Sequence, residues 1–375
     1  MYADADNILE SQQFRTGRHW VATYKNGSFI FSDSYSELKR EIISDFPSKY
    51  DSKIYAFDAH NKYIFNNKFH TIIGLNGVFS SFNSYSIPYG ETVFAQTVSE
   101  DVAEFDIIDP YVNMVYISGN GFNLNTGARL NIHSEYGTNL VYNINPSYNF
   151  KLKNGNLKAL TSYSTAYITP SLYQLYDSTY GNIGLDPEES ATVEAGLEFS
   201  SDAIRLSAVY FNRETTNYID FVTVDPVNFI SEYRNINEKF NASGVELELD
   251  YAFSDKLNIK TNYTLTQAEE RFALRIPKHK INASLNYNIS SNSFASLTYQ
   301  FNDDRTDSFF DSETFESKKV TLKSYNLLDF YISHRVNENI KIFGGVSNLT
   351  NEDYEEIYRF NTRGRNAKFG LALNF

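Results

Sequence analysis

Cysteine is absent, which excludes disulfides, thiolate metal sites and cysteine nucleophiles, so we first consider carboxylates and histidines as possible catalysts or metal ligands. Glu246, Glu248 and Asp250 alternate along one stretch, and paired carboxylates can act as general acid and base. Alternate residues of a β-strand share one face, however, and carboxylates placed there keep a surface hydrated. We therefore interpret this set as a polar wall, and we predict no catalytic residue and no enzyme activity.

The other potential metal ligands are dispersed along the chain. The 6 histidines show no paired spacing typical of a metal site. One expected loop is rich in acidic residues, namely Asp303, Asp304, Asp307, Asp311, Glu313 and Glu316. Calcium prefers such oxygen ligands, but their spacing matches no rigid calcium loop. We expect a solvated loop, keep calcium in the long loops as the alternative, and predict no other metal and no cofactor.

Three tyrosines form the first candidate ligand-binding set. Tyr173, Tyr176 and Tyr180 lie close together in an expected loop at residues 167–188. Aromatic faces suit a large planar ligand. The alternative is that these rings pack within the loop.

Arg275 is a second candidate ligand-binding residue. It directly precedes a strand expected to begin near residue 278, so it could reach the end of that strand. Its planar guanidinium can bind amide oxygens, carboxylates or phosphate. The alternative is an ion pair with Glu269 or Glu270 in the same connection.

Strict alternation of apolar and polar residues recurs along the chain and is typical of β-strands with one apolar and one polar face. At the C-terminus Phe375, Leu373, Leu371, Phe369 and Ala367 alternate with small or polar residues. The same period is found at residues 193–199, 245–251, 281–287 and 328–332. The second face carries carboxylates in several of these stretches, so it must meet water, either in a lumen or at the outside of the molecule.

About 18 strands are predicted, and the connections between them alternate between short and long. The strands are expected near 1–13, 17–25, 29–43, 53–65, 69–84, 103–116, 122–134, 139–150, 156–166, 189–199, 204–214, 240–252, 257–267, 278–288, 293–302, 325–335, 339–348 and 364–375. Tight turns rich in Asn, Gly, Asp and Ser are expected at 26–27, 66–67, 118–121, 154–156, 200–202, 254–255, 290–292 and 337–338. Long connections are expected at 85–102, 167–188, 214–239, 302–323 and 349–364. Short turns at one end and long loops at the other are the rule in outer-membrane barrels.

The pattern of strands and connections favours an antiparallel transmembrane β-barrel over a soluble β-sandwich, and the composition is compatible with it. Aromatic residues make up 16% of the chain, and no apolar run approaches the length of about 20 residues that a transmembrane helix needs. Barrel strands are only half apolar, so a mean hydropathy of -0.42 is compatible with a barrel. The net charge of -13 argues against nucleic acid as a partner. No linker or composition shift divides the chain, so residues 1–375 are predicted to form a single domain.

Two stretches resemble the barrel of TonB-dependent outer-membrane receptors. They are YITPSLYQLYDSTYGNIGLDPEESATVEAGLEF at 167–199 and NLTNEDYEEIYRFNTRGRNAKFGLALNF at 348–375. The second stretch is most similar to the cobalamin receptor and its siderophore-receptor relatives. The resemblance is clear from about residue 139 onward, and earlier it extends only to the rhythm of strands and turns.

The resemblance implies an all-β barrel of 22 strands that encloses an amino-terminal plug, with a TonB-contacting box ahead of the plug. About 18 strands and no plug-like stretch are recognised here, so we expect a partial barrel domain without the plug and the first strands. As in similar barrels, Phe375, Leu373, Leu371 and Phe369 are expected to form the assembly signal that the outer-membrane insertion machinery reads.

The implied function is that of a receptor and transporter in the outer membrane of a Gram-negative bacterium. Its ligand would be cobalamin or another corrinoid, or an iron–siderophore chelate, and transport would be energised by TonB through the missing plug. Outer-membrane lipid and lipopolysaccharide are further expected partners, and a surface lipoprotein is another candidate. The alternatives are a passive pore or surface-binding barrel without TonB coupling, and a soluble β-sandwich that binds carbohydrate.

Overall fold

The computed structural model describes residues 8–374 except 226, 229, 270, 312, 313 and 315, and within these residues it contains 22 strands and one short helix. The first strands are β1 (Ile8–Tyr24), β2 (Gly27–Ile43), β3 (Ser48–Phe65), β4 (Phe69–Ser86), β5 (Ala95–Val98), β6 (Glu104–Ile117), β7 (Phe122–His133), β8 (Gly137–Leu152) and β9 (Gly155–Ile168). Helix α1 (Leu172–Tyr176) follows. The remaining strands are β10 (Glu188–Ser200), β11 (Ile204–Thr216), β12 (Tyr218–Asp225), β13 (Ile230–Ile236), β14 (Phe240–Ala252), β15 (Leu257–Ala268), β16 (His279–Ser290), β17 (Ser293–Asn302), β18 (Arg305–Asp311), β19 (Glu316–Leu322), β20 (Tyr325–Arg335), β21 (Ile340–Ser347) and β22 (Asn366–Leu373). No described helix has the length and apolar character needed to cross a membrane.

Eighteen of these strands belong to one sheet, and the other four form the separate hairpins β12–β13 and β18–β19. The chain divides into two compact units, each described below by itself. Unit 1 comprises residues 1–146, 162–191 and 214–239, and unit 2 comprises residues 147–161, 192–213 and 240–375. Both extra hairpins fall inside predicted long connections, which therefore contain regular structure of their own.

Every predicted tight turn joins two consecutive strands of the structure. Asn26 between β1 and β2, and Asn66 and Asn67 between β3 and β4, have φ angles of 66°, 51° and 54°. Asparagine tolerates this left-handed region, which the two-residue turns of antiparallel hairpins require. The turn chemistry thus confirms the antiparallel pairing that was predicted from the sequence.

The prediction of two separate strands at 1–13 and 17–25 is wrong, because β1 runs without a break from Ile8 to Tyr24. Gly17 suggested a turn, but it lies within the strand opposite Ser34. A Cβ atom at this position would lie only 2.6 Å from the carbonyl oxygen of Asp33, so glycine permits a close approach of β1 and β2. The main sheet still has 18 strands, because it also includes the unpredicted short strand β5.

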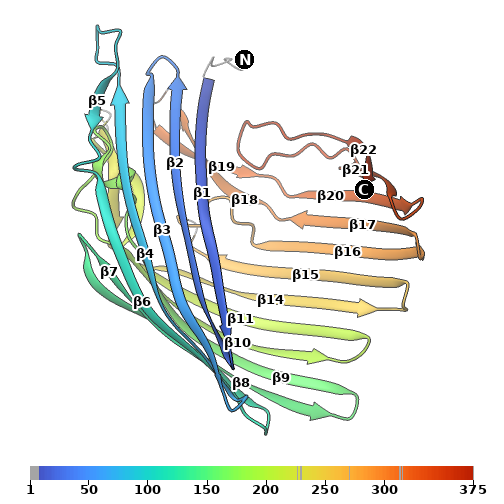
Figure 1. Ribbon diagram of the computed structural model, residues 1–375. Helices are drawn as coiled ribbons and strands as arrows, with labels where there is room; N and C mark the ends of the chain where they lie inside the picture. The colour runs from blue at the N-terminus through green and yellow to red at the C-terminus, as the bar shows by residue number, and fades with distance from the viewer. Residues whose placement is uncertain are drawn as a thin grey trace. The chain divides into compact units, whose positions relative to one another are not determined.

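Unit 1 is built on long strands. Strands β1–β4 lie side by side (Figure 1) and have 17 or 18 residues each. A tilted strand needs about 9–11 residues to cross a bilayer, so these strands are long enough to extend well beyond one. A small apolar core combines Phe82 of β4 with Val98 of β5, Ala103 and Leu172 of helix α1.

Unit 2 shows how strand register sorts apolar and polar side chains. Five apolar residues from neighbouring strands form one cross-strand row, namely Ile259, Leu285, Leu297, Phe330 and Val346. The next row consists of Lys260, Ser284, Thr298 and Asp329. Adjacent rows point to opposite faces of a sheet, so one face is continuously apolar and the other is polar, as the alternation predicted.

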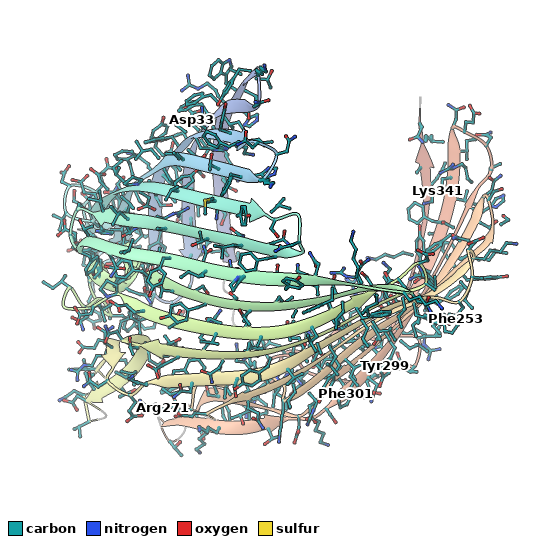
Figure 2. The ribbon with its side chains drawn as sticks, turned by 90° about the horizontal axis from the view of Figure 1, so that it is seen from below. Asp33, Phe253, Arg271, Tyr299, Phe301 and Lys341 are labelled. Carbon is teal, nitrogen blue, oxygen red and sulfur yellow. The ribbon has the colours of Figure 1, made fainter. Side chains whose placement is uncertain are left out.

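Aromatic residues in unit 2 lie toward both ends of the strands. Figure 2 shows Phe253 at the end where the short turns lie, and Arg271 at the end where the long connections lie. Tyr299 and Phe301 lie between them, in the second half of β17 (Figure 2). Such an arrangement matches the aromatic girdles expected of a membrane barrel.

Candidate functional site

Unit 1 contains an open cleft at the end of its strands where residues 44–47, 87–103 and 169–187 connect them. We call this end the long-loop end and the hollow the tyrosine cleft. Its volume is about 910 Å³, and its lining includes Tyr50, Tyr85, Tyr89, Tyr173 and Tyr180. Hydroxyl groups of Ser84, Ser86, Thr92, Thr97, Ser178 and Thr179 line it as well. Aromatic faces combined with a few polar groups are typical of a small-molecule site.

Two of the predicted tyrosines are partly buried in packing. The Tyr173 ring lies 6.0 Å from that of Tyr50 and 6.4 Å from that of Phe82, and Tyr176 packs against the same core. Burial raises the pKa of both tyrosines, so their phenols remain neutral hydrogen-bond donors at physiological pH. The packing alternative therefore holds for Tyr173 and Tyr176, and Tyr173 lines the cleft in addition.

Tyr180 is the most accessible of the three predicted tyrosines. Its ring is 40% exposed and stands edge-on to Phe221 of β12 at 5.3 Å. Its carbonyl oxygen accepts a hydrogen bond of 3.1 Å from the backbone of Tyr233 in β13, and the Asn182 side chain donates to the carbonyl of Tyr233. The β12–β13 hairpin thus supports this side of the cleft, and contact of Tyr180 with a ligand stays a prediction.

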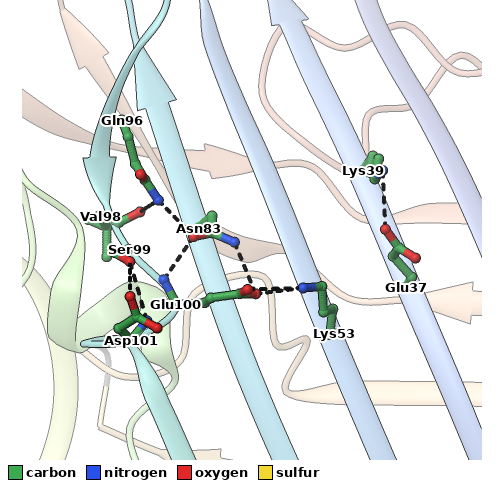
Figure 3. A network of polar contacts seen from close by, with 9 residues as sticks. All are labelled: Glu37, Lys39, Lys53, Asn83, Gln96, Val98, Ser99, Glu100 and Asp101. Atoms are coloured by element: carbon green, nitrogen blue, oxygen red, sulfur yellow. Dashed lines mark hydrogen bonds and ion pairs between the residues drawn. The ribbon is translucent and has the colours of Figure 1, made fainter.

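A polar network around Asn83 lies next in sequence to the lining residues Ser84 and Thr97 (Figure 3). The side-chain carbonyl of Asn83 accepts hydrogen bonds from the Glu100 backbone amide at 2.8 Å and from Gln96 at 2.9 Å. Lys53 donates to the Glu100 carboxylate at 2.8 Å. This hydrogen bond lowers the pKa of Glu100, which keeps the carboxylate ionised. The network ties the connection that contains β5 to strands β3 and β4.

Arg275, the other predicted ligand-binding residue, lies in an ion pair in unit 2. Its Nε donates to Asp307 at 2.7 Å, and its backbone amide donates to the carbonyl of Thr306. The sequence suggested Glu269 or Glu270 as alternative partners, and Glu270 lies outside the described residues. An ion pair is therefore present, but its partner is 32 residues away on the β18–β19 hairpin. Ligand binding by Arg275 stays a prediction.

Asp307 joins three connections of unit 2, and we call its contacts the aspartate clasp. Its side chain is fully buried and accepts from the backbone amides of Ser308 and Tyr358 as well as from Arg275. Burial opposes ionisation of this carboxyl group. The hydrogen bonds from Tyr358, Arg275 and Ser308 outweigh that effect and hold its pKa below the usual value.

The described carboxylates of the predicted acidic loop do not gather at one point. Asp307 belongs to the clasp, Asp311 pairs with Lys318, and Glu313 lies outside the described residues. Within the described part of the chain, no three histidines or carboxylates converge as metal ligands would. Calcium binding in the long loops stays a prediction.

The polar wall predicted around Glu248 lies in unit 2. Asp250 pairs with Lys260 at 2.7 Å, and Arg205 pairs with Glu198 at 2.7 Å. Glu248 lies opposite Asn262 in the β14–β15 register. The residues Arg205, Glu248, Asp250, Lys260 and Asn262 line a hollow of about 290 Å³.

Three of the residues expected to form the assembly signal lie on β22. Phe369, Leu371 and Leu373 alternate along the strand and are 89%, 58% and 49% exposed. They lie opposite Gly344, Ile342 and Ile340 of β21. Phe375 lies outside the described residues, and the signal function stays a prediction.

Sequence reasoning missed several members of the tyrosine cleft. Tyr50 was left outside a strand that was expected to begin at residue 53, whereas β3 begins at Ser48. Tyr85 and Tyr89 lie at the beginning of a connection that was predicted to be long. Their concentration beside long loops was a usable signal, but only the fold brings these rings to the same hollow as Tyr173.

Comparison with known proteins identifies the class of protein. The model of a family described as TonB dependent receptor-like, beta-barrel, matches residues 2–349. The chain therefore belongs to this family, and the match includes residues 2–138, where the sequence showed only the rhythm of strands and turns.

Individual relatives are more distant. The vitamin B12 transporter BtuB of Vibrio cholerae serotype O1 is 27% identical over 237 residues, which are 62% of this chain and 36% of the relative. The chain thus spans about a third of the length of the curated relatives that it matches. Among solved structures, the copper transporter OprC has a TM-score of 0.78 at 11% identity and covers 98% of this chain, which covers 66% of OprC. The siderophore receptor PirA from Pseudomonas aeruginosa has a TM-score of 0.71 at 18% identity, with coverages of 97% and 64%. These structural similarities establish the fold alone.

Proposed function

We propose that the chain is the barrel portion of a receptor in the outer membrane of a Gram-negative bacterium, and that the receptor imports a scarce nutrient. The nutrient is a corrinoid or a metal chelate, and TonB energises its uptake. Outer-membrane lipid, lipopolysaccharide and the insertion machinery are the other proposed partners. The role is that of a receptor rather than an enzyme.

The tyrosine cleft is the observation that carries this proposal. It is formed by long connections of a barrel that belongs to the receptor family, and its volume of about 910 Å³ suits a ligand of drug size or larger. Hydrogen bonds and ring contacts hold both of its sides in place, so a ligand would meet a preformed surface. A passive pore would need no such cleft.

An uptake assay tests the proposal. The complete gene that encodes this chain is expressed in a strain without corrinoid and siderophore receptors, with and without TonB. We expect saturable uptake of cyanocobalamin or of a ferric chelate that requires TonB. Uptake that is linear in ligand concentration and independent of TonB would instead support the passive-pore alternative.

A further inference from the structure

The tyrosine cleft is acidic as well as aromatic. Asp45, Glu91 and Asp177 line it, and none of the described lining residues is a lysine, arginine or histidine. Four cations lie near this end of the neighbouring strands β2 and β3 without lining the cleft, and two of them, Lys39 and Lys53, pair with Glu37 and Glu100. Lys49 pairs with Glu41 at 3.1 Å, and Arg40 lies opposite Tyr50 in the β2–β3 register. Carboxylates therefore dominate the charge that an incoming ligand meets.

Among the described residues, none of the three carboxylates has a cationic partner. Asp45 and Glu91 are exposed. Asp177 accepts hydrogen bonds from the backbone amides of Thr179 at 3.0 Å and Tyr180 at 2.9 Å, which fix its position without neutralising its charge. The field of these three groups consequently reaches into the cleft.

We infer that the tyrosine cleft selects an uncharged or cationic ligand and discriminates against anionic chelates. The inference deepens the proposed function and rests on it, because it concerns the ligand of the same site. Neutral phenols and hydroxyl groups can hydrogen-bond amide and hydroxyl groups of a ligand, and ring faces attract a cation. An anionic ligand would gain the same ring contacts but would be repelled by three carboxylates at once.

The expected size of the discrimination follows from Coulomb's law. Unit charges about 8–10 Å apart in a water-like medium interact weakly, but three like charges together reduce the affinity of an anion by about tenfold at low salt. Screening weakens the effect as ionic strength rises, because the Debye length falls to about 8 Å at 0.15 M salt. Selectivity for ligand charge should therefore be strongest in dilute buffer.

Calorimetry on the purified full-length protein in detergent tests the inference. The probes are uncharged cyanocobalamin, the cationic ferric trihydroxamate ferrioxamine B, and anionic ferric enterobactin. We expect the tightest binding for one of the first two, at least about tenfold tighter than for ferric enterobactin at low salt. The double variant Asp45→Lys/Glu91→Lys should reduce that ratio by about tenfold or more.

Asp186→Lys serves as the matched control. Asp186 is an exposed carboxylate of the 169–187 connection that does not line the cleft. The control should leave the ratio of affinities unchanged, and far-ultraviolet circular dichroism checks that both variants fold. Tightest binding of ferric enterobactin, or an unchanged ratio in a folded double variant, overturns the charge assignment while the receptor function stands. Failure of all three probes to bind overturns both.

Discussion

The long connections of unit 1 and unit 2 are stabilised by different interactions. Those of unit 1 rest on edge-on contacts between aromatic rings and on hydrogen bonds around Asn83 and Tyr233, while the carboxylates of the tyrosine cleft have no cationic partner among the described residues. Those of unit 2 rest on charged groups that are satisfied within the loops, above all Asp307 in the aspartate clasp. The unpaired carboxylates of the tyrosine cleft and the fully paired carboxylate of the aspartate clasp indicate different roles for these two sites.

Arginines illustrate this difference in unit 2. Arg305 is buried, donates to the carbonyl of Glu355 at 2.6 Å and lies over the ring of Tyr325. Arg359 lies over the rings of Phe309 and Tyr358. Guanidinium groups used in this way order the loops and have fewer donors left for a ligand. The comparison therefore favours unit 1 as the ligand-binding region and unit 2 as a rigid frame.

Breaking the aspartate clasp should destabilise the protein locally more than any other substitution considered below. Asp307→Ala leaves the half-exposed Arg275 and the backbone amides of Ser308 and Tyr358 without their acceptor, and each buried donor left unsatisfied costs about 1–3 kcal/mol. We expect the β18–β19 hairpin to lose hydrogen-exchange protection and to become sensitive to trypsin. Asp304→Ala, at an exposed position of the same connection, is the control. It should change neither the hydrogen-exchange protection of the hairpin nor its sensitivity to trypsin. Equal protection in both variants would show that the clasp does not order the loops.

The same clasp predicts a dependence on pH. The pKa of Asp307 is lowered in the folded protein, so its stabilising effect is complete above the ordinary carboxyl pKa of 3.8 and is lost as pH falls through the lower folded value. Protection of the hairpin should thus persist at pH 4 and decline only in stronger acid. A decline centred at pH 5 or above would contradict the assignment.

A pair of tyrosine variants separates packing from ligand contact in unit 1. Tyr173→Ala removes a ring that packs on Tyr50 and Phe82, and we expect a local loss of about 2–4 kcal/mol, seen as faster exchange in helix α1. Tyr180→Ala removes a partly exposed ring and should cost less than about 1 kcal/mol of stability. Its affinity for the ligand should nevertheless fall. Unchanged affinity in Tyr180→Ala would remove this residue from the site.

The smallest effect is expected at the edge of the tyrosine cleft. Lys53→Met removes the hydrogen bond to Glu100, but both side chains are partly exposed and the amide hydrogen bonds to Asn83 remain. Exchange in the β5 connection should rise slightly at low salt and hardly at all at high salt. Because the pKa of Glu100 is lowered, the difference from wild type should vanish as pH falls through that lower value. Asn83→Ala should increase hydrogen exchange in the β5 connection clearly more than Lys53→Met does.

The strands of the sheet could be predicted because the signals for them, alternation and turn residues, are local in the sequence. Alternation fixes which side chains share a face, and turns such as Asn66-Asn67 fix where strands reverse. The Arg275–Asp307 pair could not be predicted, because its members lie 32 residues apart and other carboxylates are nearer in sequence. The hairpins inside the long connections were also missed. Tyrosines were recognised in only one of the loops that form the cleft.

Hydrogen exchange of the full-length receptor with and without its ligand tests the comparison most directly. Bound ligand should increase the protection of amides in residues 84–97 and 173–180, which line the tyrosine cleft. Amides of the β18–β19 hairpin should already be protected without ligand and should change little. Protection that instead rises in residues 305–322 and is unchanged in the cleft would place the ligand in unit 2 and contradict this account.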